Sequence, residues 1–253
     1  MSYSKIRRTI KEALVYRFSR PKPPRHPTRF IGPVLVVGSA PGSNLPKGFD
    51  ENFSVLTVNG SQSVARKWGI AKPDATFLHF NQVDGTNDNA VAVRRVLNGE
   101  ETGILYVMRW PFGEQRLRDG LAAFNYRYDQ LRMVSTYQRI ALHEAVMGAR
   151  HSELDNARKF SNGITAVLYA FNSGASTVVI SGINPGSTGH VYNELGLRRL
   201  HSDMDSSILL KLRGRGANLF TADPEVVVSI GLPLWQGAGG RSEPLPQPDV
   251  RAR

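Results

Sequence analysis

Short runs of apolar, often β-branched residues recur along the chain, and each run is bounded by glycine or by polar residues. Runs of this length and composition are typical of strands that lie buried on both faces of a parallel sheet. They predict strands at residues 32–38, 54–58, 75–80, 103–108, 176–181 and 217–221.

Helical patterns alternate with these predicted strands. A helix is expected from Asn59 through Trp68, an apolar helix begins at the capping residues 160–163 and stops at Gly174, and a third covers residues 202–213. Because strand and helix alternate, the predicted fold class is α/β, with a single Rossmann-like parallel sheet and helices on both faces.

Two stretches interrupt the alternation. Residues 111–158 are rich in Arg, Tyr and Met without a regular period, which predicts a mostly helical insertion or lid, and residues 185–200 are a second place for a lid. From Glu243 the chain has three prolines in five residues, which is typical of a disordered tail. The expected organisation is an arm at 1–30, a main domain at 31–240 and a tail at 241–253.

The first 30 residues differ in charge from the rest of the chain. They carry nine Lys and Arg side chains against the single acid Glu12, a net +8 of the chain's +11. Apolar residues recur every four positions among the basic ones, which predicts a basic amphipathic helix from Ser4 to Arg20 and a stiff proline-rich connector after it. Two interpretations stay open: the helix lies on an anionic membrane, or its apolar stripe packs on the body of the protein. The stripe consists of Ile6, Ile10, Leu14, Val15 and Phe18.

Composition narrows the classes of function. The chain has no cysteine, which excludes disulfides, thiol catalysis and zinc sites with Cys ligands. No apolar run reaches the roughly 18 residues of a membrane span, and the N-terminus lacks the apolar core of a signal peptide. The expected location is therefore the cytoplasm, on the inner face of the membrane. The basic charge lies in a separable arm and not around a cleft, which argues against nucleic acid as a partner.

Polar residues follow several of the predicted strands, and ligands of open α/β sheets bind beyond the carboxyl ends of strands. After the first strand comes Gly38-Ser39-Ala40-Pro41-Gly42-Ser43, whose glycines permit close approach of main-chain N–H groups to a phosphate. An ordinary strand-to-helix turn explains the same residues equally well, because neither the dinucleotide nor the P-loop fingerprint is present. The other polar strand ends are Asn59-Gly60-Ser61, Asn81-Gln82 and Gly182-Ile183-Asn184.

The apolar helix opens with Lys159-Phe160-Ser161-Asn162-Gly163. Free N–H groups and the helix dipole at such a start favour a carboxylate or phosphate ligand. The simpler interpretation is that Ser161 or Asn162 only caps the helix.

His201 stands just ahead of the predicted helix at 202–213, where Ser202 and Asp205 have the spacing of a capping box. A neutral imidazole there could take a proton from a hydroxyl, while a surface or hydrogen-bonded histidine is the plainer interpretation, as it is for His79. Asp203 and Asp205 also form the Asp-x-Asp that binds a cation in many nucleotide-sugar enzymes. Capping and the helix dipole explain both carboxylates without a metal.

Taken in order, these segments resemble the bacterial sialyltransferases of glycosyltransferase family 42. The family has a Gly-Asn-Gly-Pro-Ser type turn after its first strand and asparagines after the next two strands. Its later features are an Arg-x-Thr-Ser-Gly helix start, a Ser-Gly-Ile-Asp strand end, a glycine and tyrosine loop, and His-Ser before a helix. Over about residues 33–235, the matching positions here are Gly38-Ser39-Ala40-Pro41, Asn59, Asn81, Lys159–Gly163, Ser181–Asn184, Gly189 with Tyr192, and His201-Ser202.

The resemblance implies a GT-A-like sheet domain with a small helical lid, and inverting transfer of a sialic-type sugar from a CMP donor with no obligatory metal or other cofactor. His201 would be the general base that activates the acceptor hydroxyl, and Tyr192 would donate a hydrogen bond to the leaving phosphate. The acceptor would be a glycan or a lipid-linked saccharide. The residues expected to hold the donor are Gly38, Ser39, Ala40, Pro41, Asn59, Asn81, Lys159, Ser161, Asn162, Gly163, Gly182 and Asn184.

Three departures from the family pattern bear on the donor sugar. Gly186 stands where the family has a second phosphate-binding tyrosine, unless His190 substitutes for it. Lys159 replaces an arginine and loses the bidentate fork, and Ser39 replaces an asparagine and has one donor fewer. A Kdo-like or nonulosonate-like sugar carried on CMP is therefore a second candidate for the donor.

Two other functions stay open. One is a non-catalytic, membrane-docked scaffold, in which His201 and Tyr192 would not share a pocket. The other is a phosphoryl or pyrophosphoryl transferase that uses the turn at 38–43, which would need magnesium and clustered carboxylates. Few acidic residues follow the predicted strands, so the second alternative ranks lower.

Overall fold

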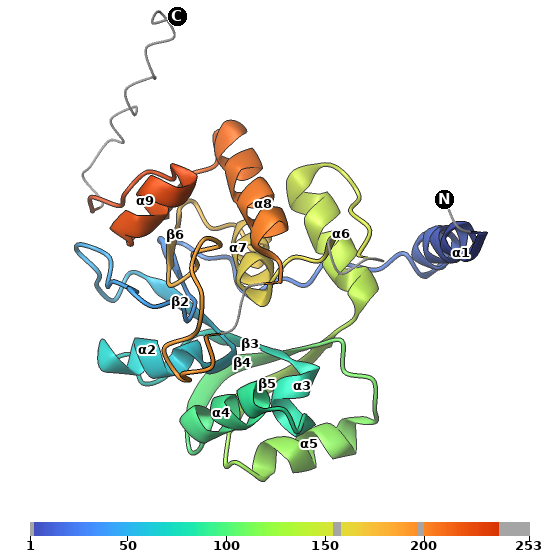
Figure 1. The fold of residues 1–253 in the computed structure, drawn as a ribbon, viewed down its shortest axis with the longest axis horizontal. Coiled ribbons are helices and arrows are strands. Elements are labelled where there is room, and N and C mark those ends of the chain that lie inside the picture. The colour runs from blue at the N-terminus through green and yellow to red at the C-terminus, as the bar shows by residue number, and fades with distance from the viewer. Residues whose placement is uncertain (1–2, 154–157, 197–199, 238–253) are drawn as a thin grey trace, which may run out of the picture.

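The computed structural model describes residues 3–153, 158–196 and 200–237, in which seven parallel strands form one sheet in the order β5-β4-β3-β2-β1-β6-β7 (Figure 1). All six predicted strands are present, each within two residues of its expected ends. The strands are β1 (Val34–Val37), β2 (Ser54–Val58), β3 (Ala75–His79), β4 (Glu101–Met108), β5 (Arg127–Val134), β6 (Val178–Ser181) and β7 (Leu219–Thr221).

Helices cover both faces of the sheet, as predicted. Figure 1 shows α6, α7 and α8 on one side and α2, α3, α4 and α5 on the other. The helices expected at 59–68, 160–171 and 202–213 are confirmed. The helices are α1 (Tyr3–Ser19), α2 (Gln62–Lys67), α3 (Phe80–Asp84), α4 (Asp88–Leu97), α5 (Glu114–Ala122), α6 (Thr136–Met147), α7 (Asn162–Asn172), α8 (Ser202–Gly214) and α9 (Pro224–Ile230), with a 3-10 turn η1 (Asn59–Ser61) before α2.

The central strand β1 is buried on both faces. Val34 and Val36 belong to the core that includes α7, whereas Leu35 and Val37 face the opposite side, toward Val64 of α2. Each of these β1 side chains is fully buried, and burying one stabilises the fold by about 1.5–3 kcal/mol. This double burial explains why the strands appear in the sequence as continuous apolar runs.

The region 111–158 contains an edge strand and is not a mostly helical insertion. Here β5 pairs in parallel with β4 from Glu101↔Arg127 to Met108↔Val134. Of the β5 residues only Val134 is buried, because an edge strand needs little apolar surface. The sequence therefore showed no apolar run to mark it. The second lid candidate is not helical either where it is described, since residues 185–196 form turns and one isolated bridge.

The N-terminal helix α1 confirms the predicted basic helix and stands apart from the sheet, joined by the proline-rich connector (Figure 1). Three residues of its stripe do not pack on the body, because Ile10, Leu14 and Phe18 are 54%, 49% and 81% exposed, whereas Val15 is half-buried. It meets α6 through the Tyr16 hydroxyl, which bonds Glu144. In the described part of the chain, no helix is long and apolar enough to cross a membrane. The predicted tail at 241–253 lies outside the described residues.

Gly38 is required where β1 and β6 end side by side. A Cβ atom at Gly38 would lie 2.2 Å from the carbonyl oxygen of Gly182, and backbone atoms cannot turn away as a flexible side chain can. We expect Gly38→Ala to lower the free energy of unfolding by about 1–3 kcal/mol, measured by urea denaturation. The control is Gly214→Ala at the end of α8, where nothing lies within 4 Å and stability should stay the same or rise slightly. Equal stability of the two variants would contradict the packing described here.

Candidate functional site

A cavity of about 330 Å³ opens at the carboxyl ends of β2, β3 and β4. Asn59 directly follows β2, His79 ends β3 and Arg109 directly follows β4, while Asn162 begins α7 and His201 caps the start of α8. The sequence analysis named four of these five residues, and the structure brings them together. The cavity is also lined by Gln82, Asn89, Arg139, Phe160, Ser161, His190, Leu200 and Asp205.

Two of the four non-glycine residues that have positive φ in the described part of the chain line this cavity. Asn59 and Arg109 adopt left-handed conformations, with φ of 50° and 58°. Residues other than glycine rarely adopt this region, and where they do, the strain is often part of a functional site. Asn59 is fixed by its side chain, whose Oδ1 accepts hydrogen bonds from the His79 N–H (3.2 Å) and from Asn162 Nδ2 (3.3 Å).

His201 is a neutral histidine with one ring nitrogen that has no hydrogen-bond partner among the described residues. That nitrogen is Nδ1, which is buried. Burial lowers the pKa of His201, and the positive charges of Arg139, Lys159 and Arg109 lower it further, while a hydrogen bond to the backbone of Lys159 partly offsets this. The ring is therefore neutral at pH 7, and its Nδ1 lone pair is not used by any other described residue.

The predicted capping box after His201 is wrong. The Ser202 hydroxyl donates to the carbonyl of Pro185 (2.6 Å), and Asp205 Oδ1 accepts from the N–H of Ser161 (2.9 Å). These two contacts join the start of α8 to the loop at 185 and to the start of α7. Both are tertiary contacts, which the local spacing of Ser202 and Asp205 could not reveal.

At the start of α7, Ser161 caps the helix, as the simpler interpretation expected. Its hydroxyl accepts from the Ile164 N–H as an N-cap, and its own N–H is occupied by Asp205. Gly163 is needed for packing, because a Cβ atom there would lie 3.3 Å from the Ile183 side chain. Lys159 does not line the cavity, although its charge lowers the pKa of both His79 and His201.

In the turn after β1, where a phosphate cradle was predicted, two main-chain N–H groups are used within the protein. The N–H groups of Gly38 and Ala40 donate to the carbonyls of Ser181 (2.7 Å) and Gly182 (2.8 Å). Pro41 has no N–H. These main-chain donors are therefore used to join β1 to β6. Ser39 differs, because its hydroxyl lies 2.8 Å from Nδ1 of His190, which lines the cavity.

Three further predicted donor-binding residues lie outside the cavity lining. The N–H of Gly182 donates to Asp223 (2.6 Å), which joins the end of β6 to the start of α9, and Asn184 Oδ1 accepts from the Gly186 N–H (3.0 Å) in a local turn. Asn81 lies in the first turn of α3, and its neighbour Gln82 lines the cavity instead. The Oε1 of Gln82 is buried without a partner among the described residues.

Tyr192 lies beside the cavity and does not line it. Its ring stacks on His190 with centroids 5.0 Å apart, and it presses on Gly60, where a Cβ atom would be 2.6 Å from the ring. Tyr192 lines a neighbouring groove of about 560 Å³ with residues of α4. The role of its hydroxyl stays a prediction, and His190 occupies the position between Tyr192 and the cavity.

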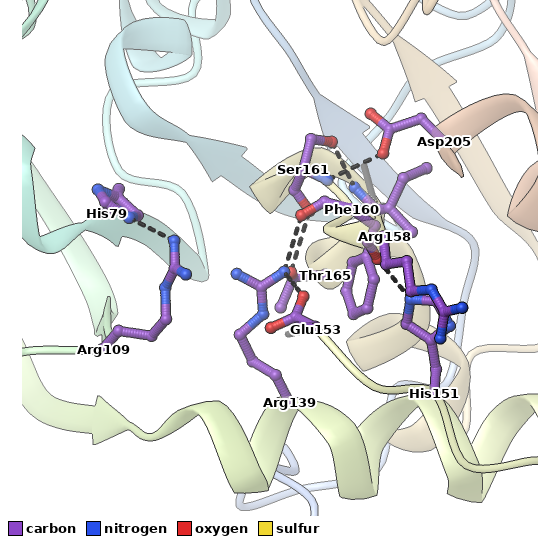
Figure 2. A network of polar contacts seen from close by, with 11 residues as sticks. His79, Arg109, Arg139, His151, Glu153, Arg158, Phe160, Ser161, Thr165 and Asp205 are labelled. Carbon is purple, nitrogen blue, oxygen red and sulfur yellow. Dashed lines mark hydrogen bonds and ion pairs between the residues drawn. The ribbon is translucent and has the colours of Figure 1, made fainter. Parts of the chain in front are cut away.

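Two arginines of the cavity, Arg109 and Arg139, were not predicted from the sequence (Figure 2). Arg109 directly follows the predicted strand at 103–108, so the strand-end argument could have found it. Arg139 lies on α6 in the irregular region and gave no signal. Its Nη2 donates to Glu153 (2.8 Å) and to the carbonyl of Phe160 (2.8 Å), and both side chains of the ion pair are almost fully buried.

Among the described residues, no group of three or more His, Asp or Glu side chains could hold a metal ion. In the Asp-x-Asp at 203–205, Asp205 accepts a hydrogen bond from the Ser161 N–H, and Asp203 lies in the first turn of α8.

No model of a known protein family matches the chain, and no curated protein sequence matches it. Among solved structures, the chain is similar to the monofunctional alpha-2,3-sialyltransferase Cst-I from Campylobacter jejuni, with 14% identity, 84% of each chain covered and a TM-score of 0.50. It is also similar to the sialyltransferase CST-II in complex with a trisaccharide acceptor and CMP, with 12% identity, 83% of this chain and 88% of that chain covered, and a TM-score of 0.50. The chain therefore has the fold of these sialyltransferases, as the α/β prediction expected.

Proposed function

We propose that this chain is a glycosyltransferase that moves sialic acid, or a related acidic sugar, from a CMP donor to a glycan or lipid-linked acceptor. The observation that carries the proposal is His201, a neutral histidine that lines a polar cavity at the carboxyl ends of the strands and whose Nδ1 has no hydrogen-bond partner among the described residues. The shared fold supports it, since CST-II was solved with CMP and a trisaccharide acceptor.

In the proposed reaction, His201 takes the proton of an acceptor hydroxyl while that oxygen attacks the anomeric carbon of the donor sugar. The bond from this carbon to the phosphate oxygen breaks, CMP leaves with the electron pair, and the configuration is inverted. Hydrogen-bond donors must stabilise the negative charge that develops on the phosphate. The amides of Asn59 and Asn162 and the ring of His190 line the cavity and are our candidates for this task, with the Tyr192 hydroxyl as a further one, and the proposed reaction uses no obligatory metal.

A non-catalytic scaffold is the second candidate, and the position of Tyr192 favours it. The scaffold interpretation expected His201 and Tyr192 to lie in different pockets, and Tyr192 lies outside the lining of the His201 cavity. Release of CMP from a CMP-sugar donor separates the two candidates, because a scaffold binds the nucleotide without turnover.

We also propose that α1 holds the enzyme on an anionic membrane, on the cytoplasmic side. Exposed Ile10, Leu14 and Phe18 lie among basic residues on a helix that stands apart from the sheet (Figure 1). Apolar side chains that enter the headgroup region and cations that meet anionic lipids both favour such binding. A lipid-linked acceptor, as in lipopolysaccharide biosynthesis, would be within reach of an enzyme held there.

Replacing His201 tests the proposed chemistry. His201→Ala should lower turnover of CMP-sialic acid by at least about 100-fold while leaving CMP affinity largely intact, because only the proton transfer is lost. Since the pKa of His201 is lowered and the base acts in its neutral form, kcat/KM of the wild type should fall with falling pH at a midpoint below the ordinary pKa of histidine. His26→Ala is the control, since that ring bonds Thr28 far from the cavity lining. Full activity of His201→Ala in a coupled CMP-release assay would contradict the role of His201.

Replacing exposed apolar residues tests membrane binding. The double substitution of Leu14→Ser and Phe18→Ser should weaken sedimentation with phosphatidylserine vesicles by about tenfold or more, because two apolar side chains no longer enter the membrane. Val228→Ser is the matched control, since Val228 is 89% exposed on α9. Phosphatidylcholine vesicles should bind the wild type only weakly. Unchanged sedimentation of the double variant would reject α1 as the membrane anchor.

A further inference from the structure

Arg109 is a cation that lines the cavity without a carboxylate partner. None of the ion pairs formed by the described residues includes Arg109. Its Nη2 donates to His79 Nε2 at 2.6 Å, and its Nε is buried with no partner (Figure 2). Of the carboxylates near the cavity, Glu153 pairs with Arg139 through Oε1 and leaves Oε2 buried without a partner, and Asp205 accepts from the Ser161 N–H.

His79 orients Arg109 and does not neutralise it. A guanidinium can only donate, so Nε2 of His79 must be the acceptor. A neutral imidazole has one acceptor nitrogen, so Nδ1 carries the proton, and the 3.4 Å contact between the Asn81 N–H and Nδ1 is not a hydrogen bond in this tautomer. Burial and the charges of Arg109 and Arg139 lower the pKa of His79 to about 3, so the ring carries no charge at neutral pH.

An unpaired, partly buried cation is costly, and an anionic ligand offsets that cost. The left-handed backbone at Arg109 adds strain that the packing of β4 must overcome. Arginine suits oxyanions in particular, because its planar fork can bond two oxygens of one carboxylate or phosphate. The residue at 159 is a lysine, which has no such fork and does not line the cavity, whereas Arg109, directly after β4, supplies a fork in the cavity lining.

We propose that Arg109 binds the oxyanion of the ligand in this cavity and that His79 positions its guanidinium. The inference rests on the proposed function for the identity of that ligand, whose oxyanion is either the sugar carboxylate or the nucleotide phosphate. Inorganic phosphate and acetate represent these two sources, and neither probe depends on recognition of the nucleotide.

The test follows the ring signals of His201 by NMR, in protein labelled with ¹³C-histidine at pH 7.5 and constant ionic strength, while phosphate or acetate is added. The wild type should show a saturable shift, and Arg109→Gln should weaken the binding at least tenfold. Arg109→Lys should fall between them, because it keeps the charge and loses the fork. Arg116→Gln, which removes a surface partner of Asp84, is the control and should match the wild type. Tighter binding of acetate would identify the sugar carboxylate as the oxyanion that Arg109 binds, and tighter binding of phosphate would identify the nucleotide phosphate.

His79 is tested with two substitutions that differ in one property. His79→Gln keeps an acceptor for Arg109 and should retain anion binding, whereas His79→Phe keeps a ring without an acceptor and should lose it. Saturable binding that Arg109→Gln leaves unchanged would overturn the inference, as would the absence of saturable binding in the wild type. Phosphate binding that depends on Arg109, in a protein that does not bind CMP, would instead uphold Arg109 and reject the proposed function.

Discussion

Parallel pairing of β2, β3 and β4 in one register is the constraint on which the site depends. Val58 pairs with Phe77, and His79 pairs with Met108, so the residues that end or follow these strands meet at one edge of the sheet. The strands are held by their hydrogen-bonded ladders and by apolar side chains on both faces. The polar groups of the cavity are thus positioned by a rigid scaffold and not by a flexible loop.

At the same edge of the sheet, the ends of β1 and β6 are joined to each other by main-chain hydrogen bonds. Gly38 and Gly182 bring the ends of β1 and β6 so close that their main-chain groups bond each other, which leaves these N–H groups unavailable to a ligand. The cavity lies toward β2, β3 and β4, where α7 and α8 begin, and Asn59, His79 and Arg109 line it.

The sequence could predict the strands because burial on both faces leaves continuous apolar runs, and it could predict the strand-end residue Asn59 and the helix-start residues Asn162 and His201. It could not predict β5, because an edge strand with one buried residue has no such run. The hydrogen-bond partners of Ser202 and Asp205 could not be predicted from the sequence either. Their local spacing suggested a capping box, whereas the observed contacts join segments far apart in the chain. Tyr192 was expected in the site by resemblance, and the stack on His190 places it in the next groove.

Calorimetric titration with CMP, CDP and UDP in the absence of metal tests the central claim, that this cavity holds a cytidine monophosphate donor, most directly. Asn59→Gly is the variant to compare, because glycine keeps the left-handed backbone and removes only the side chain. The account predicts selective binding of CMP by the wild type and clearly weaker binding by Asn59→Gly. No binding of CMP, or binding that Asn59→Gly leaves unchanged, would contradict it.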